Sequence, residues 1–239
     1  MERDMRDRML AVCRRFAEAA PAEAMIREPY LPYVPANWNG VLVLAEAQQL
    51  AGPKQYHELL RGLSAEQRMD RLSLPYPSGI GVGPWDDGTA KLALKAMMPE
   101  LDLSQVAVGN AVPWSCRTES GTNANPTEAM WRQAAAFWRE LLDVWRPEFR
   151  PLILLGKVAA RVLDDAGARN AVKLRLPSPN NIQRICGMFD QDDLLARYPE
   201  VGVAGAELGI SLNPSNVFFA CHAVSLGHRQ MRPANGGRA

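Results

Sequence analysis

Four short apolar runs in this chain are each followed by a side chain that can take part in chemistry. Glu46, Asn110 and Lys157 follow the first three runs, and Ser178 with Asn180 follows the fourth. A carboxylate can orient or deprotonate a water, and an amide can donate and accept hydrogen bonds at the same time. A cation and a hydroxyl can hold a phosphate. If these groups meet, they form a site for a ligand that carries both polar edges and negative charge.

The elements that would position these groups read as a parallel sheet. Each apolar run is short and rich in β-branched or aliphatic residues, as in strands buried on both faces, and helical segments separate the runs. We expect strands at residues 41–45, 105–108, 151–155 and 171–175, and helices at 53–71, 89–98, 125–145 and 157–167. This alternation predicts an α/β fold in which a central four-stranded parallel sheet lies between helical layers. Ligands of such sheets bind at the carboxyl ends of the strands, where the four groups lie.

Local signals refine the helices. Met5, Met9, Val12 and Phe16 have helical spacing and predict an amphipathic N-terminal helix over residues 4–20. Residues 190–227 read as helical with a break near Asn213-Pro214.

The strongest helix start is at residues 125–128. Asn125 is the expected N-cap, Pro126 the first helical residue and Glu128 the partner in a capping box. Along this helix the tryptophans Trp131, Trp138 and Trp145 recur every seven residues, which predicts a core-facing stripe.

Composition bounds the class of protein. The chain has 239 residues, 47% hydrophobic and 22% charged, which suits one globular domain over residues 1–239 with a core at about 41–185. No apolar run is long enough to span a membrane, and the charged N-terminus lacks a signal-peptide core, so we expect a cytoplasmic protein without membrane contact. The four cysteines form no C-x-x-C pair, so we expect reduced, mostly buried thiols.

The formal net charge is only +1, so binding to nucleic acid would need a local basic surface. Between residues 156 and 186 the only acids are Asp164 and Asp165, and the cations are Lys157, Arg161, Arg169, Lys173, Arg175 and Arg184. Charge counts alone favour a solvated surface, with phosphate binding as the alternative.

The strand-end segments together resemble the uracil-DNA glycosylase superfamily, and most closely its iron–sulfur branch. Residues 45–49 read Ala-Glu-Ala-Gln-Gln where that branch has Gly-Glu-Ala-Pro-Gly, and residues 176–179 read Leu-Pro-Ser-Pro where it has His-Pro-Ser-Pro. Three further segments match in order: Pro84-Trp85, then Asn110 leading to Cys116-Arg117, then Pro126-Thr127-Glu128 leading to the Leu-Gly-x-x-Ala segment over residues 154–160. The resemblance covers residues 41 to 184 and implies that superfamily's three-layer α/β/α sandwich.

The resemblance implies a DNA glycosylase that flips a base out of DNA and hydrolyses its N-glycosidic bond, leaving an abasic site. Glu46 and Asn110 would be catalytic, Glu46 acting on the water and opposing the positive sugar. The base would meet Trp85, Asn110, Gln48 and Ala47, with Trp114 and Tyr76 as reserve stacking residues. The DNA backbone would meet Lys157, Arg161, Arg175, Pro177, Ser178, Pro179, Asn180, Asn181 and Arg184. For Glu46 the alternative is a carboxylate bonded to a helix N-terminus, and for Asn110 a turn-forming residue.

The sequence departs from the family at several of these positions. Leu176 replaces the loop histidine, and losing one preorganised donor typically costs about 10²–10³ in rate. Ala45 and Gln48 replace the glycine and proline of the first motif. Only Cys116 matches a cluster cysteine, so we expect no iron–sulfur cluster and no other cofactor. We expect the target to be uracil or, because of these changes, a modified pyrimidine such as a hypermodified cytosine in phage DNA.

Two other functions stay open at this point. One is a non-catalytic DNA or modified-base binding protein of the same fold, favoured by Leu176. The other is an unrelated α/β enzyme that binds a phosphorylated small molecule at Gly156-Lys157, although the chain has neither a GxxxxGK[ST] nor a GxGxxG pattern. We expect DNA as the partner, no obligate protein partner and a monomer.

Overall fold

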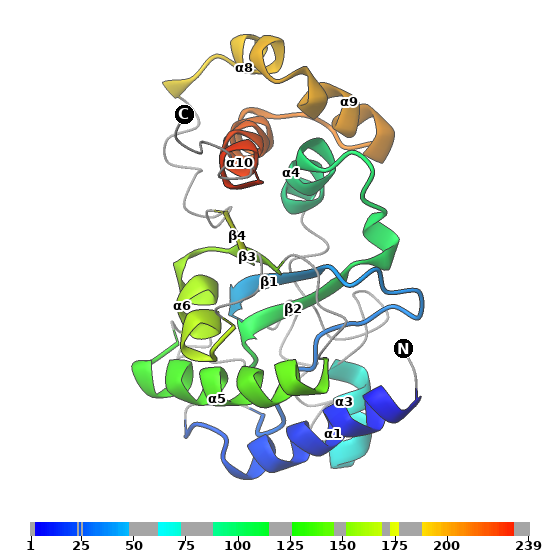
Figure 1. Ribbon diagram of the computed structural model, residues 1–239, viewed down its shortest axis with the longest axis vertical. Coiled ribbons are helices and arrows are strands. Elements are labelled where there is room, and N and C mark those ends of the chain that lie inside the picture. Colours follow the sequence, from blue (N-terminus) through cyan, green and yellow to red (C-terminus); the bar gives the residue numbers. More distant parts are fainter. Residues whose placement is uncertain are drawn as a thin grey trace, which may run out of the picture. The chain divides into compact units, whose positions relative to one another are not determined.

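The computed structural model describes most of the chain, in two compact units (Figure 1). The first unit comprises Met1–Asp86 and Ser104–Lys173, and the second comprises Asp87–Leu103 and Leu174–Ala239. The single domain expected from the sequence stays a prediction. The described residues are 3–22, 24, 26–47, 62–72, 88–114, 126–145, 152–168, 173–176 and 188–231.

The first unit is mixed α/β and is built on a small sheet of three parallel strands. The strands are β1 (Leu42–Ala47), β2 (Ala107–Val112) and β3 (Leu152–Leu155), with β1 between the other two. Leu42 is level with Ala107 and Leu152, and Leu44 is level with Gly109 and Leu154. Their buried apolar side chains explain why these runs form central strands.

Two strands extend further than the sequence predicted. β1 runs to Ala47, so Glu46 lies inside the strand instead of just beyond it, and β2 runs from Ala107 to Val112, so Asn110 is also internal. Pairing causes the extension, because Ala45 is level with Asn110 and Ala47 with Val112. The fourth predicted strand is present as β4 (Lys173–Leu176), and its membership of a four-stranded sheet stays a prediction.

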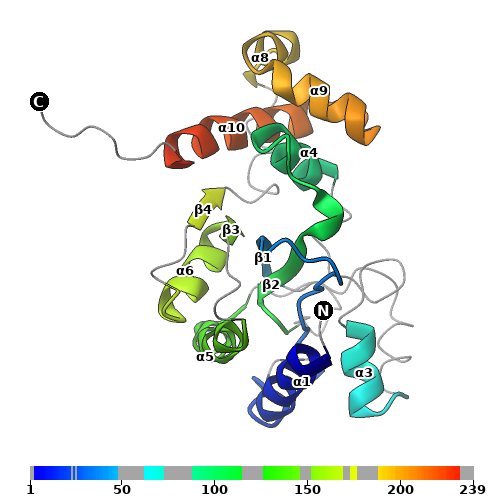
Figure 2. The ribbon, with the colours of Figure 1, turned by 45° about the vertical axis from the view of Figure 1, so that its right-hand side comes forward.

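Helices cover one face of this sheet. They are α5 (Glu128–Val144) and α6 (Lys157–Asp165), with α1 (Arg3–Glu18) packed on α5. The short helix α3 (Ala65–Leu72) lies beside α1 (Figure 2). An ion pair between Arg14 and Glu66, at 2.8 Å, links the two helices. α1 itself confirms the N-terminal helix predicted at 4–20. Of the helix predicted at 53–71, residues 53–61 lie outside the described residues.

The tryptophan stripe on α5 is confirmed at two of its three positions. Trp138 and Trp145 are fully buried in the core, where they pack against one another and against Phe137 and Trp38. Trp138 also donates from Nε1 to the Ala111 carbonyl at 2.8 Å, which ties α5 to strand β2. Trp131 packs against this core but is only partly buried, so the core-facing stripe is confirmed there in part.

The start of α5 differs from the prediction. Thr127 is the N-cap, with its hydroxyl accepting from the Met130 N–H at 3.4 Å, and Glu128 is the first helical residue. The predicted N-cap, Asn125, lies outside the described residues. The helix starts two residues later because Thr127 has extended backbone angles and a hydroxyl within reach of the third helical N–H.

The described part of the second unit is helical apart from residues 174–176 of β4. It contains α4 (Gly88–Met97), α8 (Gln191–Arg197), α9 (Pro199–Leu208) and α10 (Pro214–Met231), and the short 3-10 helix η2 (Leu103–Gln105) follows α4. α10 packs against α4, α8 and α9 (Figures 1 and 2). The predicted break near Asn213-Pro214 is confirmed, and Tyr198 adds a second break between α8 and α9. Within the described ranges, every helix is too short or too polar to cross a membrane.

Candidate functional site

Glu46 and Gly156 come together at the carboxyl edge of the sheet. Gly156 lies between β3 and α6 with a φ of 93°, a conformation that favours glycine. A Cβ on this residue would lie 2.6 Å from Cγ of Glu46 and still closer to its carboxylate. The glutamate side chain therefore occupies the space that only a glycine leaves open.

The same carboxylate caps the start of α6. The N-cap Gly156 has no side chain to accept the first helical N–H groups, and the Val158 N–H donates to Oε1 of Glu46 at 3.4 Å. A negative charge is favourable at this end of a helix. The alternative interpretation of Glu46, a carboxylate bonded to a helix N-terminus, is therefore present in the structure. This bond engages one carboxylate oxygen.

Asn110 lies on the strand beside Glu46, but its side chain leaves the sheet on the other face. Asn110 is level with Ala45, and successive side chains of a strand point to opposite faces, so Glu46 shares the face of Leu44 while Asn110 shares the face of Ala45. Asn110 is only 6% exposed. The two groups can serve one ligand only around the carboxyl edge of the strands.

Lys157 and Arg161 form the cationic part of this region. Both are exposed and lie one turn apart on α6, so they share a face of the helix. The Arg161 guanidinium lies 4.8 Å from the ring centre of Trp131 on α5, and it is 4.0 Å from Glu128. This cation–π contact joins α6 to α5 and holds the guanidinium at the surface between the two helices.

Arg175 belongs to the second unit. It is exposed, and its backbone exchanges two hydrogen bonds with the side-chain amide of Gln230 on α10, at 2.9 and 3.1 Å. Trp114, a reserve stacking residue, is 1% exposed and donates from Nε1 to the Arg27 carbonyl at 3.1 Å, so its ring is core and the stacking role was wrong.

The other predicted site residues lie outside the described part of the chain. These are Gln48, Trp85, Pro177, Ser178, Pro179, Asn180, Asn181, Arg184 and Tyr76, and the side chains of Ala47 and Leu176 share that status.

Sequence reasoning missed the role of Gly156 and the partner of Arg161. A glycine directly after a buried strand is a signal for close approach of another group, and it could have pointed to the carboxylate. Nothing in the heptad spacing of the tryptophans distinguished Trp131 from the two buried ones. The partial burial of Trp131 depends on how α6 packs on α5, which is a property of the tertiary structure.

The described thiols are not activated nucleophiles. Burial first and the charge of Glu28 second raise the pKa of Cys13 far above its usual range. Burial, with Glu200 as the next cause, raises the pKa of Cys221 to about 11. Such groups stay protonated and poorly reactive at neutral pH. In the described ranges, His, Cys, Asp and Glu do not gather in threes that could hold a metal ion.

Comparison with known proteins leaves the family open. The chain matches no protein-family model and no curated protein sequence.

Proposed function

We propose that this protein is a monofunctional DNA glycosylase of the uracil-DNA glycosylase type. Its target would be uracil or a modified pyrimidine, and its product an abasic site. The fold we propose is a three-layer α/β/α sandwich on four parallel strands in the order β2-β1-β3-β4. We propose that it acts on DNA in the cytoplasm as a monomer and without a cofactor.

The contact between Glu46 and Gly156 carries this proposal. These residues belong to two different segments that resemble the superfamily, and they are separated by more than a hundred positions in the sequence. In the structure the glutamate of one segment fills the space left by the glycine of the other. Two motif residues that require each other sterically support the view that the motifs form one site.

The two carboxylate oxygens of Glu46 would have different roles at this edge of the sheet. The Val158 N–H holds Oε1 of Glu46, which leaves Oε2 for a water. The negative charge of Glu46 would also oppose the positive sugar that forms as the glycosidic bond breaks. Because the negative charge of Glu46 lies at the start of α6, the exposed side chains of Lys157 and Arg161 would hold a DNA phosphate.

Base release from a panel of oligonucleotides tests the proposal. The panel carries uracil, hypoxanthine, and hydroxymethylated or glucosylated cytosine, in single and double strands. We expect release from at least one substrate, with a loss of about 10²–10⁴ in rate for Glu46→Gln, the range for a positioned acid or base. Glu140→Gln, a surface carboxylate on α5 that pairs with Arg15, is the matched control and should keep full activity. No release from any substrate, or equal rates for both variants, refutes the proposal.

A second candidate is a DNA or modified-base binding protein without catalysis. The opposite orientation of Glu46 and Asn110 favours it, because a catalytic carboxylate and a base-reading amide would act most directly from one face. Leu176 in place of a donor histidine favours it as well. Binding of a modified oligonucleotide without an abasic product, unchanged in Glu46→Gln, would select this candidate.

A further inference from the structure

Along helix α10 of the second unit, two aromatic rings are followed by a cation, and of these three side chains the second ring and the cation are exposed. Phe218, His222 and Arg229 lie at spacings of four and seven residues, which places them along one stripe of the helix. The influence of Arg229 on the titration of His222 agrees with this placement. The stripe offers flat rings at one end and positive charge at the other.

The rings form a stack that is open to solvent at both ends. Phe189, which precedes α8, lies 4.6 Å from Phe218 between ring centres, and Phe218 is parallel to His222 at 6.3 Å and 3°. Phe218 is buried between its neighbours, whereas Phe189 is 49% exposed and His222 is exposed. Partial burial of the His222 ring is the larger cause, and the charge of Arg229 the smaller cause, of a lowered pKa at this residue. The ring is therefore neutral at neutral pH and can stack like other aromatic rings.

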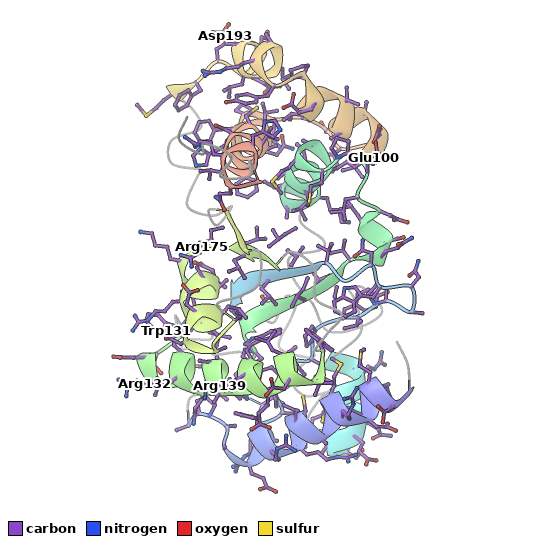
Figure 3. All side chains as sticks on the ribbon, viewed as in Figure 1. Glu100, Trp131, Arg132, Arg139, Arg175 and Asp193 are labelled. Carbon is purple, nitrogen blue, oxygen red and sulfur yellow. The ribbon has the colours of Figure 1, made fainter. Side chains whose placement is uncertain are left out.

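The cationic end joins two segments that are far apart in the sequence. Gln230 accepts from the Arg175 N–H at 2.9 Å and donates to the Arg175 carbonyl at 3.1 Å, which brings β4 to the residue that follows Arg229. Both arginines are exposed, and Figure 3 shows Arg175 on β4. Neither α10 nor β4 contains Asp or Glu, so their surface complements a polyanion.

We propose that this stripe, formed by Phe189, His222, Arg175 and Arg229, binds single-stranded DNA, with bases stacked on the two rings and phosphates held by the two arginines. Stacking on aromatic rings together with a cationic track is how proteins hold single strands without reading their sequence. Acids follow the ring end in the sequence: Asp190 directly follows Phe189 and, as the N-cap of α8, accepts from the N–H groups of Asp192 and Asp193. Phosphates are therefore favoured at the α10 end and bases at the Phe189 end. The choice of DNA over RNA rests on the proposed function.

Fluorescence anisotropy with a labelled oligothymidine tests the stripe on the full chain. We expect Arg175→Gln/Arg229→Gln to reduce the slope of log affinity against log salt by about 1.4, which is 0.7 for each lost phosphate contact on a single strand. Arg8→Gln/Arg14→Gln on α1 of the first unit removes the same charge and should leave the slope unchanged. Equal slopes for the wild type and the stripe variant, or equal losses in both variants, overturn the proposal.

Ring variants test the stacking half. His222→Ala and Phe189→Ala should each weaken binding about tenfold, the effect of losing one base–aromatic stack. Phe189→Leu keeps apolar cover over Phe218 and should weaken binding nearly as much while the melting temperature stays at the wild-type value. Unchanged affinity in the folded ring variants overturns the proposal, as does equal competition by polyglutamate. Competition by oligouridine as strong as by oligothymidine keeps the surface and extends its ligand to RNA.

The outcome is separable from that of the glycosylase proposal. Base release that depends on Glu46, together with arginine variants that bind normally, would overturn the stripe alone. Normal dependence of binding on the stripe without any base release would overturn the glycosylase alone.

Discussion

Replacing Gly156 with alanine tests the contact on which the candidate site depends. Gly156 has φ 93° and ψ 171°, a region that essentially only glycine occupies, and strain there costs about 1–3 kcal/mol for another residue. The new Cβ would also lie 2.6 Å from Cγ of Glu46, so the carboxylate must leave its place. Displacing it removes the bond from the Val158 N–H, worth about 0.5–1.5 kcal/mol, and a helix-end charge interaction of about 0.3–1 kcal/mol.

We therefore expect Gly156→Ala to lower the free energy of unfolding by about 2–5 kcal/mol, measured by urea denaturation with tryptophan fluorescence. Gly167 is a matched control at the other end of α6, because it has φ 85° and, apart from its chain neighbours, a Cβ there would meet no atom of the described residues within 4 Å. Gly167→Ala carries backbone strain alone and should cost about 1–2 kcal/mol.

A double-mutant cycle separates the clash from the strain. Glu46→Ala removes the group that Gly156→Ala displaces, so the double variant should be more stable than the sum of the single effects by about 1 kcal/mol or more. The reasoning is refuted if Gly156→Ala costs no more than Gly167→Ala. It is also refuted if the Glu46 and Gly156 effects add without coupling.

Three further predictions concern the packing and the helix ends. Trp138→Phe should cost about 2–4 kcal/mol in urea denaturation, because it leaves a cavity and removes the donor to the Ala111 carbonyl; a cost under about 1 kcal/mol would contradict this. Asp190→Ala should lower stability by about 1 kcal/mol through loss of the α8 cap, while Asp190→Asn should be close to neutral, and equal losses in both would argue against capping. Proton NMR should show His222 titrating below its ordinary pKa, because burial and the charge of Arg229 lower its pKa. The unfolded chain then takes up the proton first, so stability falls as the pH drops below the ordinary pKa of histidine. Arg229→Gln should raise the pKa of His222, and an unchanged titration would contradict an interaction between the two side chains.

The sequence also left specific parts of the site undetermined. The identity of Glu46, Asn110, Lys157 and Arg161 as the polar residues near strand ends followed from short apolar runs and what comes after them. Their mutual orientation did not follow, because a one-residue shift in the register of two strands moves a side chain to the opposite face. In the structure Ala45 is level with Asn110, and Glu46 and Asn110 consequently point to opposite faces.

Features that depend on neighbours along the chain could be predicted from the residues alone. The helices at 3–18 and 128–144 followed from helical spacing of apolar residues, and the break at Asn213-Pro214 followed from the chemistry of proline. Three contacts could be found only by folding the chain. The Glu46 side chain fills the space that Gly156 leaves open, and the Arg161 guanidinium lies over the Trp131 ring. The side-chain amide of Gln230 is hydrogen-bonded to the backbone of Arg175 on β4. Each of these contacts joins segments on different elements, and the bond from Val158 to Glu46 spans 112 positions. Local propensity acts over a few residues, whereas such contacts depend on how whole strands and helices pack.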